Sequence, residues 1–162
     1  MSRPLEKKIA DLKKLKKLIT HLKSRGKSVV FTNGCFDLLH YGHVKYLQDA
    51  KEKGDILVVG INSDASVKRI KGKMRPIVGE KDRLRLVAGL ESVDYAVLFN
   101  EDTPLKIIKE IKPDVLVKGA DWNRNNIVGR DIVLDYGGSV STVKFIKGYS
   151  TTGLIKTIVK RV

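Results

Sequence analysis

The side chains of this sequence best placed for chemistry are two histidines, His40 and His43, which stand three residues apart in VVFTNGCFDLLHYGH. A β-branched run over 28–32 predicts a buried strand, the pair at 33–34 predicts a turn, and Tyr41 onward predicts a helix. The histidines therefore lie near a helix start, where unpaired N–H groups and the positive end of the helix dipole attract anions. Side chains at this spacing share one face of a helix. The arrangement predicts a site for nucleotide phosphates.

A second candidate is the basic segment KRIKGKMRP at 68–76, which follows residues 62–64 in a predicted loop. A basic, glycine-containing loop at the end of a strand can close over phosphates and neutralise a leaving pyrophosphate. The alternative is a solvated run of charge with no ligand. We favour phosphate binding because the segment stands next to the histidine site, and Lys71, Lys73 and Arg75 are its strongest candidates.

The third candidate is a run of hydroxyls, Ser150, Thr151 and Thr152, at the predicted start of the last helix. One such hydroxyl is explained by helix capping alone, but three exceed that need. The pair Asp121-Trp122 follows a predicted strand, and its tryptophan has two open interpretations, a plug in the core or a support for a base or sugar. Asp64 could bind a ligand or simply cap a helix.

These candidates need elements to position them, and apolar runs with strand character alternate with helical periodicity along the chain. Such alternation predicts an α/β fold with a parallel sheet, in which ligands bind beyond the carboxyl ends of the strands. The predicted strands are 28–32, 55–61, 94–99, 114–118 and 139–146, and the predicted helices are 42–53, 82–91, 103–112, 128–136 and 151–160.

The first 26 residues are set apart by charge. Residues 1–27 hold ten Lys or Arg against two acidic residues, so this segment carries +8 of a net charge of +14. Apolar residues recur at helical spacing from Leu5 to Leu22, which predicts one amphipathic helix ending near Gly26, whose stripe covers the domain or a dimer partner. We expect this helix at 1–26 and a single catalytic domain at 27–162.

The composition, with 42% hydrophobic and 31% charged residues, is typical of a globular protein. No apolar run reaches the ~20 residues of a membrane span, no signal-peptide pattern is present, and the lone cysteine cannot form an internal disulfide. We therefore expect a cytoplasmic protein without membrane insertion. The basic charge is typical either of a polyanion-binding surface or of a lysine-rich solvated exterior, and we favour the second.

The segment GCFDLLHYGH resembles the G-[TS]-F-D-x-x-H-x-G-H signature of the HxGH nucleotidyltransferase superfamily, and GYSTTGLIKTI resembles its second signature. Cys35 stands where most relatives carry Thr or Ser. The resemblance implies a single Rossmann-like, HUP-type three-layer domain with an extra N-terminal helix. It implies Mg²⁺ that arrives bound to ATP, with no metal-binding residues in the protein itself.

The resemblance also implies roles for particular residues. Four would act on the reacting phosphates: His40, His43, Lys73 and Arg75. Ten would bind the nucleotide: Thr32, Asn33, Gly34, Cys35, Phe36, Gly42, Lys71, Ser150, Thr151 and Thr152. Six would bind the second substrate: Asp64, Arg83, Lys118, Asp121, Trp122 and Arg130.

Longer blocks such as NSDASVKRIKGKMRP, VLVKGADW and IVGRDIVLDYGG are similar to the heptose 1-phosphate adenylyltransferases. In that family the unit is often fused behind a sugar kinase, for which this chain has no room, so we expect the stand-alone form, acting as a homodimer on ATP and a sugar 1-phosphate. The main alternative is a glycerol-3-phosphate cytidylyltransferase, whose Arg-Thr pair is replaced here by Phe145-Ile146. A remote alternative is a nucleic-acid-binding protein, which no aromatic-interleaved basic patch supports.

Overall fold

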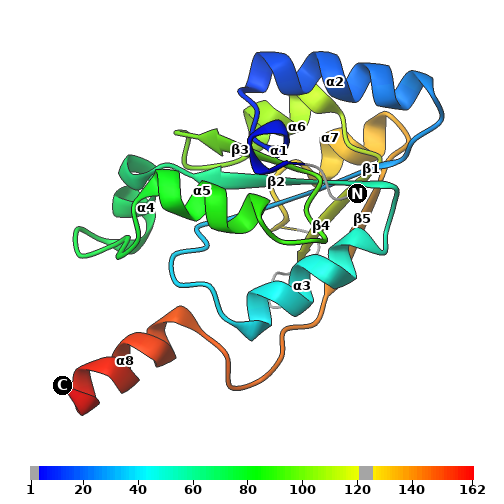
Figure 1. Ribbon diagram of the computed structural model, residues 1–162. Coiled ribbons are helices and arrows are strands. Elements are labelled where there is room, and N and C mark those ends of the chain that lie inside the picture. Colours follow the sequence, from blue (N-terminus) through cyan, green and yellow to red (C-terminus); the bar gives the residue numbers. More distant parts are fainter. Residues whose placement is uncertain (1–3, 121–125) are drawn as a thin grey trace.

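The computed structural model describes residues 4–120 and 126–162, and its centre is a five-stranded sheet (Figure 1). All the strand pairs are parallel, and the order across the sheet is β3-β2-β1-β4-β5. The parallel α/β sheet predicted from the alternation is therefore confirmed. The strands are β1 Val29–Gly34, β2 Ile56–Asn62, β3 Tyr95–Phe99, β4 Val115–Gly119 and β5 Ser139–Val143.

Helices cover both faces of this sheet and make three layers (Figure 1). Because successive side chains of a strand point to opposite faces, Phe31 and Val30 of β1 belong to two different hydrophobic clusters. The cluster that contains Phe31 includes side chains of α2 (Leu12–Ser24), α6 (Leu105–Ile111) and α7 (Arg130–Asp135). The cluster that contains Val30 includes side chains of α3 (Tyr41–Lys51) and α5 (Glu80–Ala88).

The N-terminal segment forms two helices, so the prediction of one continuous helix is wrong. Between α1 (Leu5–Lys8) and α2 the chain is extended, and Ile9 lies beside Ala96 of the edge strand β3, where the Ala10 N–H donates to the Ala96 carbonyl over 3.2 Å. Ile9 packs with the α3 and α5 cluster, whereas Leu15 is buried in the other one. The apolar stripe is split because its two halves cover opposite faces of the sheet.

A further helix, α4 (Asp64–Lys71), occupies part of the basic segment that was predicted to be a loop. It begins because the Ser63 hydroxyl accepts the Ser66 N–H over 3.1 Å, and it ends at Gly72, whose φ of +98° few other residues adopt. The true loop therefore starts at Gly72, and Lys71 belongs to the last turn of the helix.

The last helix, α8 (Thr151–Arg161), projects away from the three layers (Figure 1). None of its residues is buried, and β5 ends at Val143, three residues earlier than predicted, so a long connection leads to it. Within residues 4–120 and 126–162, no helix combines the length and apolar character that crossing a bilayer requires. The homodimer expected from the sequence stays a prediction.

Candidate functional site

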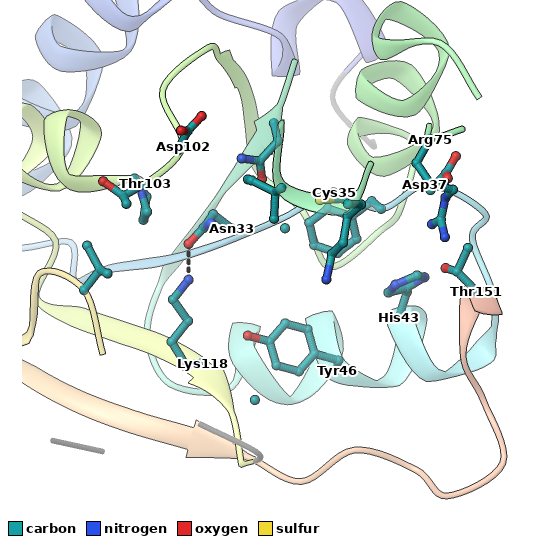
Figure 2. A pocket seen from close by; sticks show the side chains of 18 of the residues that line it. Asn33, Cys35, Asp37, His43, Tyr46, Arg75, Asp102, Thr103, Lys118 and Thr151 are labelled. Carbon is teal, nitrogen blue, oxygen red and sulfur yellow. Dashed lines mark hydrogen bonds and ion pairs between the residues drawn. The ribbon is translucent and has the colours of Figure 1, made fainter. Parts of the chain in front are cut away.

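A cavity of about 450 Å³ opens at the carboxyl ends of the central strands (Figure 2). From β1 the chain adds β2 and β3 on one side and then β4 and β5 on the other, so the connection reverses between β1 and β4. Ligands of open parallel sheets bind at such a reversal, and a volume of this size suits a small molecule. Asn33 of β1 and Lys118 of β4 lie in the cavity wall on either side of this point.

The two motif histidines form a stacked pair at the start of α3. Their ring centroids lie 3.8 Å apart at an interplanar angle of 17°, and His40 Nδ1 accepts the His43 backbone N–H over 3.3 Å. Since Nδ1 of His40 accepts, its proton lies on Nε2. Burial lowers the pKa of His40, and burial together with the neighbouring His40 lowers the pKa of His43 to about 4. Both rings are therefore neutral at neutral pH and act as hydrogen-bonding groups rather than cations.

Two glycines beside the histidines, Gly34 at the end of β1 and Gly42 in α3, leave no room for a larger side chain. Phe36 has a left-handed backbone, with φ of +47°, and a Cβ on Gly34 would lie 3.0 Å from the Phe36 ring. A Cβ on Gly42 would lie 3.0 Å from both His40 Nδ1 and Tyr149 Cβ. Gly42 was predicted to allow close approach of a nucleotide, and here it allows the close approach of the His40 ring and of the connection to α8.

Asp37 holds the basic loop against the segment between β1 and α3. Its side chain is 1% exposed, and its Oδ1 accepts the backbone N–H groups of Ile77 and Val78 over 2.8 and 2.9 Å. Its Oδ2 accepts Nε of Arg75. The buried carboxylate thereby fixes Arg75 in the cavity wall. Sequence reasoning missed Asp37 as a functional residue, although an acidic residue in the motif and a nearby run of basic residues were the available signal.

Arg83 connects three segments behind the cavity wall. Its side chain is 0% exposed, its Nε donates to the Val78 carbonyl over 2.9 Å, and a terminal nitrogen donates to Asp64 Oδ1 over 2.8 Å. The other terminal nitrogen donates to the carbonyl of Cys35. Arg83 and Asp64 were expected to bind substrate, but the structure places neither in the cavity wall, because their contacts join Cys35, Val78 and the start of α4.

Lys118 crosses the middle of the cavity and donates from Nζ to Asn33 Oδ1 (Figure 2). Burial lowers the pKa of Lys118 to about 8, so near neutral pH it is a cation that a modest rise in pH discharges. The hydroxyl of Thr32 is buried and lies 2.7 Å from the Tyr46 hydroxyl. Thr32, expected to bind nucleotide, is thus committed to positioning Tyr46, whose side chain lines the cavity.

Ten of the residues predicted from the sequence line this cavity, and most of the others lie behind or beside it. Those in the wall are Asn33, Gly34, Cys35, Phe36, His43, Lys71, Arg75, Lys118, Thr151 and Thr152. Those outside it are Thr32, His40, Gly42, Asp64, Lys73, Arg83, Arg130 and Ser150; Lys73 is exposed, and Ser150 caps α8 by accepting the Gly153 N–H. Asp121 and Trp122 lie outside the described residues. Sequence reasoning did not single out the lining residues Asp37, Tyr46, Asn62, Ile70, Asp102, Thr103, Pro104, Gly119, Val128 and Phe145.

The chemistry of this wall suits phosphate groups at one end. Figure 2 shows His43 and Thr151 on one side of the cavity, with Asp102 and Thr103 on the other and Asn33 and Lys118 between them.

Burial raises the pKa of the Cys35 thiol, which keeps it protonated and a poor nucleophile. Within the part of the chain that the structure describes, no three His, Cys, Asp or Glu residues are grouped to hold a metal ion.

Comparison of this sequence with known proteins identifies the family to which the chain belongs. Residues 31–154 match the sequence model of a family described as "Cytidylyltransferase-like". This stretch contains the whole cavity wall.

Individual relatives cover the chain almost completely. It is 54% identical over 153 residues to "Bifunctional protein HldE" of Geobacter metallireducens, and 53% identical over 153 residues to the protein of the same name from Nitratiruptor sp.. These matches cover 94% of this chain but 31% and 32% of the relatives, so the chain spans about a third of their length. A solved structure described as the "lipopolysaccharide core biosynthesis protein" of Thermoplasma volcanium GSS1 is 36% identical, with a TM-score of 0.62 over 77% of this chain and 100% of that one.

Proposed function

Because the chain belongs to the cytidylyltransferase-like family, we propose that it transfers AMP from ATP to D-glycero-β-D-manno-heptose 1-phosphate, releasing pyrophosphate and ADP-heptose for the lipopolysaccharide core. The observation that carries the proposal is the cavity, which brings His43, basic side chains and the hydroxyls of Thr151 and Thr152 together at the point where the strand order of the sheet reverses. The heptose acceptor is supported by the relatives called HldE and by the structure named for lipopolysaccharide core biosynthesis.

The reaction is an in-line attack by an oxygen of the sugar 1-phosphate on the α-phosphorus of ATP, with pyrophosphate leaving on the opposite side. The attacking oxygen is already anionic at neutral pH, so it requires no general base, and the protonated Cys35 takes no part. Catalysis then consists of positioning the phosphates and stabilising the charge that develops between them.

Each part of the wall has a role in this scheme. Neutral His43 donates a hydrogen bond to the transferring phosphate, with its orientation fixed by the stacked His40. Lys71 and Arg75 neutralise the leaving pyrophosphate, because both line the cavity and Asp37 holds Arg75 in place. The hydroxyl groups and helix N-terminus at Thr151 and Thr152 bind the far phosphates.

Mg²⁺ belongs to this proposal as part of the substrate. Mg²⁺ prefers oxygen ligands such as carboxylates and phosphates, and the Asp37 carboxylate is engaged by the Arg75 side chain and by the backbone N–H groups of Ile77 and Val78. In this proposal the cation enters on the ATP phosphates and adds to the charge neutralisation there.

A cytidylyltransferase acting on glycerol 3-phosphate is the second candidate, because the matched family carries that name. An assay of pyrophosphate release with Mg²⁺ separates the two when ATP and CTP are each paired with heptose 1-phosphate and with glycerol 3-phosphate. Turnover with ATP and heptose 1-phosphate alone is the expected result. Turnover with CTP and glycerol 3-phosphate would select the second candidate, and no turnover in any combination would reject both.

A further inference from the structure

We propose that Asp102, with its neighbour Thr103, is a specificity-determining residue that binds hydroxyl groups of the acceptor sugar. The inference rests on the proposed function, since it assigns the sugar to one end of the same cavity. Both residues follow β3, were not among the site residues predicted from the sequence, and line the cavity on the side away from His43 and Thr151 (Figure 2).

The carboxylate of Asp102 is oriented and still accessible. Arg69 Nε donates to Asp102 Oδ1 over 2.6 Å, and the Asp102 side chain remains 57% exposed. A carboxylate held in this way presents its second oxygen, Oδ2, as an acceptor for O–H donors. It repels phosphate groups, so in a cavity that must hold two phosphorylated substrates it suits the part of a ligand that carries hydroxyls.

The loop that carries Asp102 is fastened to α4 by a chain of hydrogen bonds. The Ser63 hydroxyl donates to Asn100 Oδ1 over 2.6 Å, the Ser66 hydroxyl donates to the Glu101 carbonyl over 2.9 Å, and a terminal nitrogen of Arg69 donates to the Asn100 carbonyl. Each of these bonds fixes a position one or two residues from Asp102. The hydroxyl-binding end is thus preorganised, which lowers the entropy cost of binding a flexible polyol.

Asp102 lies apart from the groups assigned to the reacting phosphates. Lys71 and Arg75 are assigned to the leaving pyrophosphate, and Asp102 lies on the side of the cavity away from His43 and Thr151. A sugar 1-phosphate whose phosphate lies at the reacting centre would extend its hydroxyl groups toward that side.

The test is steady-state kinetics of Asp102→Asn and Thr103→Val with ATP and heptose 1-phosphate. For Asp102→Asn we expect the KM for heptose 1-phosphate to rise about tenfold or more, the loss of one charge-assisted hydrogen bond, while the KM for ATP and the kcat stay within about twofold of wild type. The matched control is Glu110→Gln, because Glu110 makes an ion pair of the same 2.6 Å length with Lys16 away from this cavity.

A purely structural role is separated by a series of singly deoxygenated sugar 1-phosphates. If Asp102 binds a hydroxyl, one member of the series is used equally well by wild type and Asp102→Asn, because the contact is already missing. An equal penalty on every member, a rise confined to the KM for ATP, or unchanged kinetics would each overturn the inference. A wild-type enzyme that leaves heptose 1-phosphate unused would instead reject the proposed function.

Discussion

His40 Nδ1 accepts the backbone N–H of His43 over 3.3 Å, and the two imidazole rings stack at 3.8 Å. One side chain is therefore both the cap of α3 and the support of its neighbour. Stacking at this distance disfavours two positive charges, in agreement with the pKa of His43, which burial and the neighbouring His40 both lower. In the proposed mechanism, neutral His43 donates to phosphate with His40 as its support, and Lys71 and Arg75 neutralise the charge.

Replacing His43 by alanine should lower kcat about a hundredfold, the effect of losing one hydrogen-bond donor worth about 3 kcal/mol in the transition state. The chain should remain folded, because the ring lies at the cavity wall rather than in either hydrophobic cluster. Steady-state kinetics and circular dichroism measure the two effects. His21→Ala is the control, since His21 is exposed on α2, and near-wild-type turnover by His43→Ala would remove the histidine from the mechanism.

Stability should depend on pH through His43. Its folded-state pKa is about 4, below the ~6.5 of an unfolded histidine, so the unfolded chain binds more protons between these values. The contribution is fully present above about pH 6.5 and is lost as the pH falls toward 4. The free energy of unfolding, measured with urea, should thus fall more in wild type than in His43→Gln when the pH is lowered from 7.5 to 4.5. A difference that is constant over this range would contradict the assigned pKa.

Asp37→Asn should release the basic loop. The variant keeps an oxygen for the Ile77 and Val78 N–H groups but loses the charge that holds Arg75. We expect kcat to fall about tenfold or more, as expected for a broken buried ion pair, and trypsin to cleave after Lys73 in the same loop faster than in wild type. Asp49→Asn is the control, because Asp49 pairs with Lys45 on α3 outside the cavity. Unchanged cleavage after Lys73 would show that the loop does not depend on Asp37.

The sequence predicted the features that depend on local pattern. The alternation of strands and helices and the helix start beside His43 each follow from residues that are neighbours in the chain. The turn predicted at 33–34 is wrong, because β1 continues through Gly34, and both residues pair with β2. Asn33 of the first motif and Thr151 of the hydroxyl run still reach the cavity wall. Their roles in binding remain predictions.

The parts that were missed depend on partners distant in the chain. Ile9 leaves the helical path because the edge of β3 offers it a backbone partner 87 residues away, at Ala96. Arg83 looks like a ligand-binding cation in the sequence, and only the folded chain shows its guanidinium enclosed by three protein oxygens. Asp102 was not assigned from the sequence, because only the folded chain brings the end of β3 to the cavity wall and pairs Asp102 with Arg69 of α4.

Arg83→Met should destabilise the fold by roughly 3–5 kcal/mol, since removing one partner of a buried ion pair leaves unpaired polar groups behind. Arg83→Lys should recover only part of this loss, because an ammonium cannot reach Val78, Cys35 and Asp64 together as the planar guanidinium does. Urea unfolding measures both values. Arg85→Lys on the same helix is the control, as its ion pair with Asp82 is exposed, and should change stability by less than about 0.5 kcal/mol.

Deprotonation of Lys118 should make kcat/KM fall at alkaline pH, which gives the pH profile an alkaline limb. Its pKa is lowered to about 8, so the ammonium that donates to Asn33 is present below that pH and is lost above it. If the charge attracts a phosphorylated substrate, kcat/KM should fall with rising pH by up to about tenfold per unit above pH 8. Lys118→Arg keeps a permanent charge, so its profile should stay flat to a higher pH, whatever its absolute rate.

The control for that profile is Lys16→Arg, because Lys16 is an exposed cation on α2 and lies outside the cavity. It should retain the alkaline limb of the wild type, which excludes a general effect of replacing lysine by arginine. An alkaline limb that survives unchanged in Lys118→Arg would assign the titration to another group. Loss of the limb in this variant alone would identify the Lys118 ammonium as the charge that the substrate meets between β1 and β4.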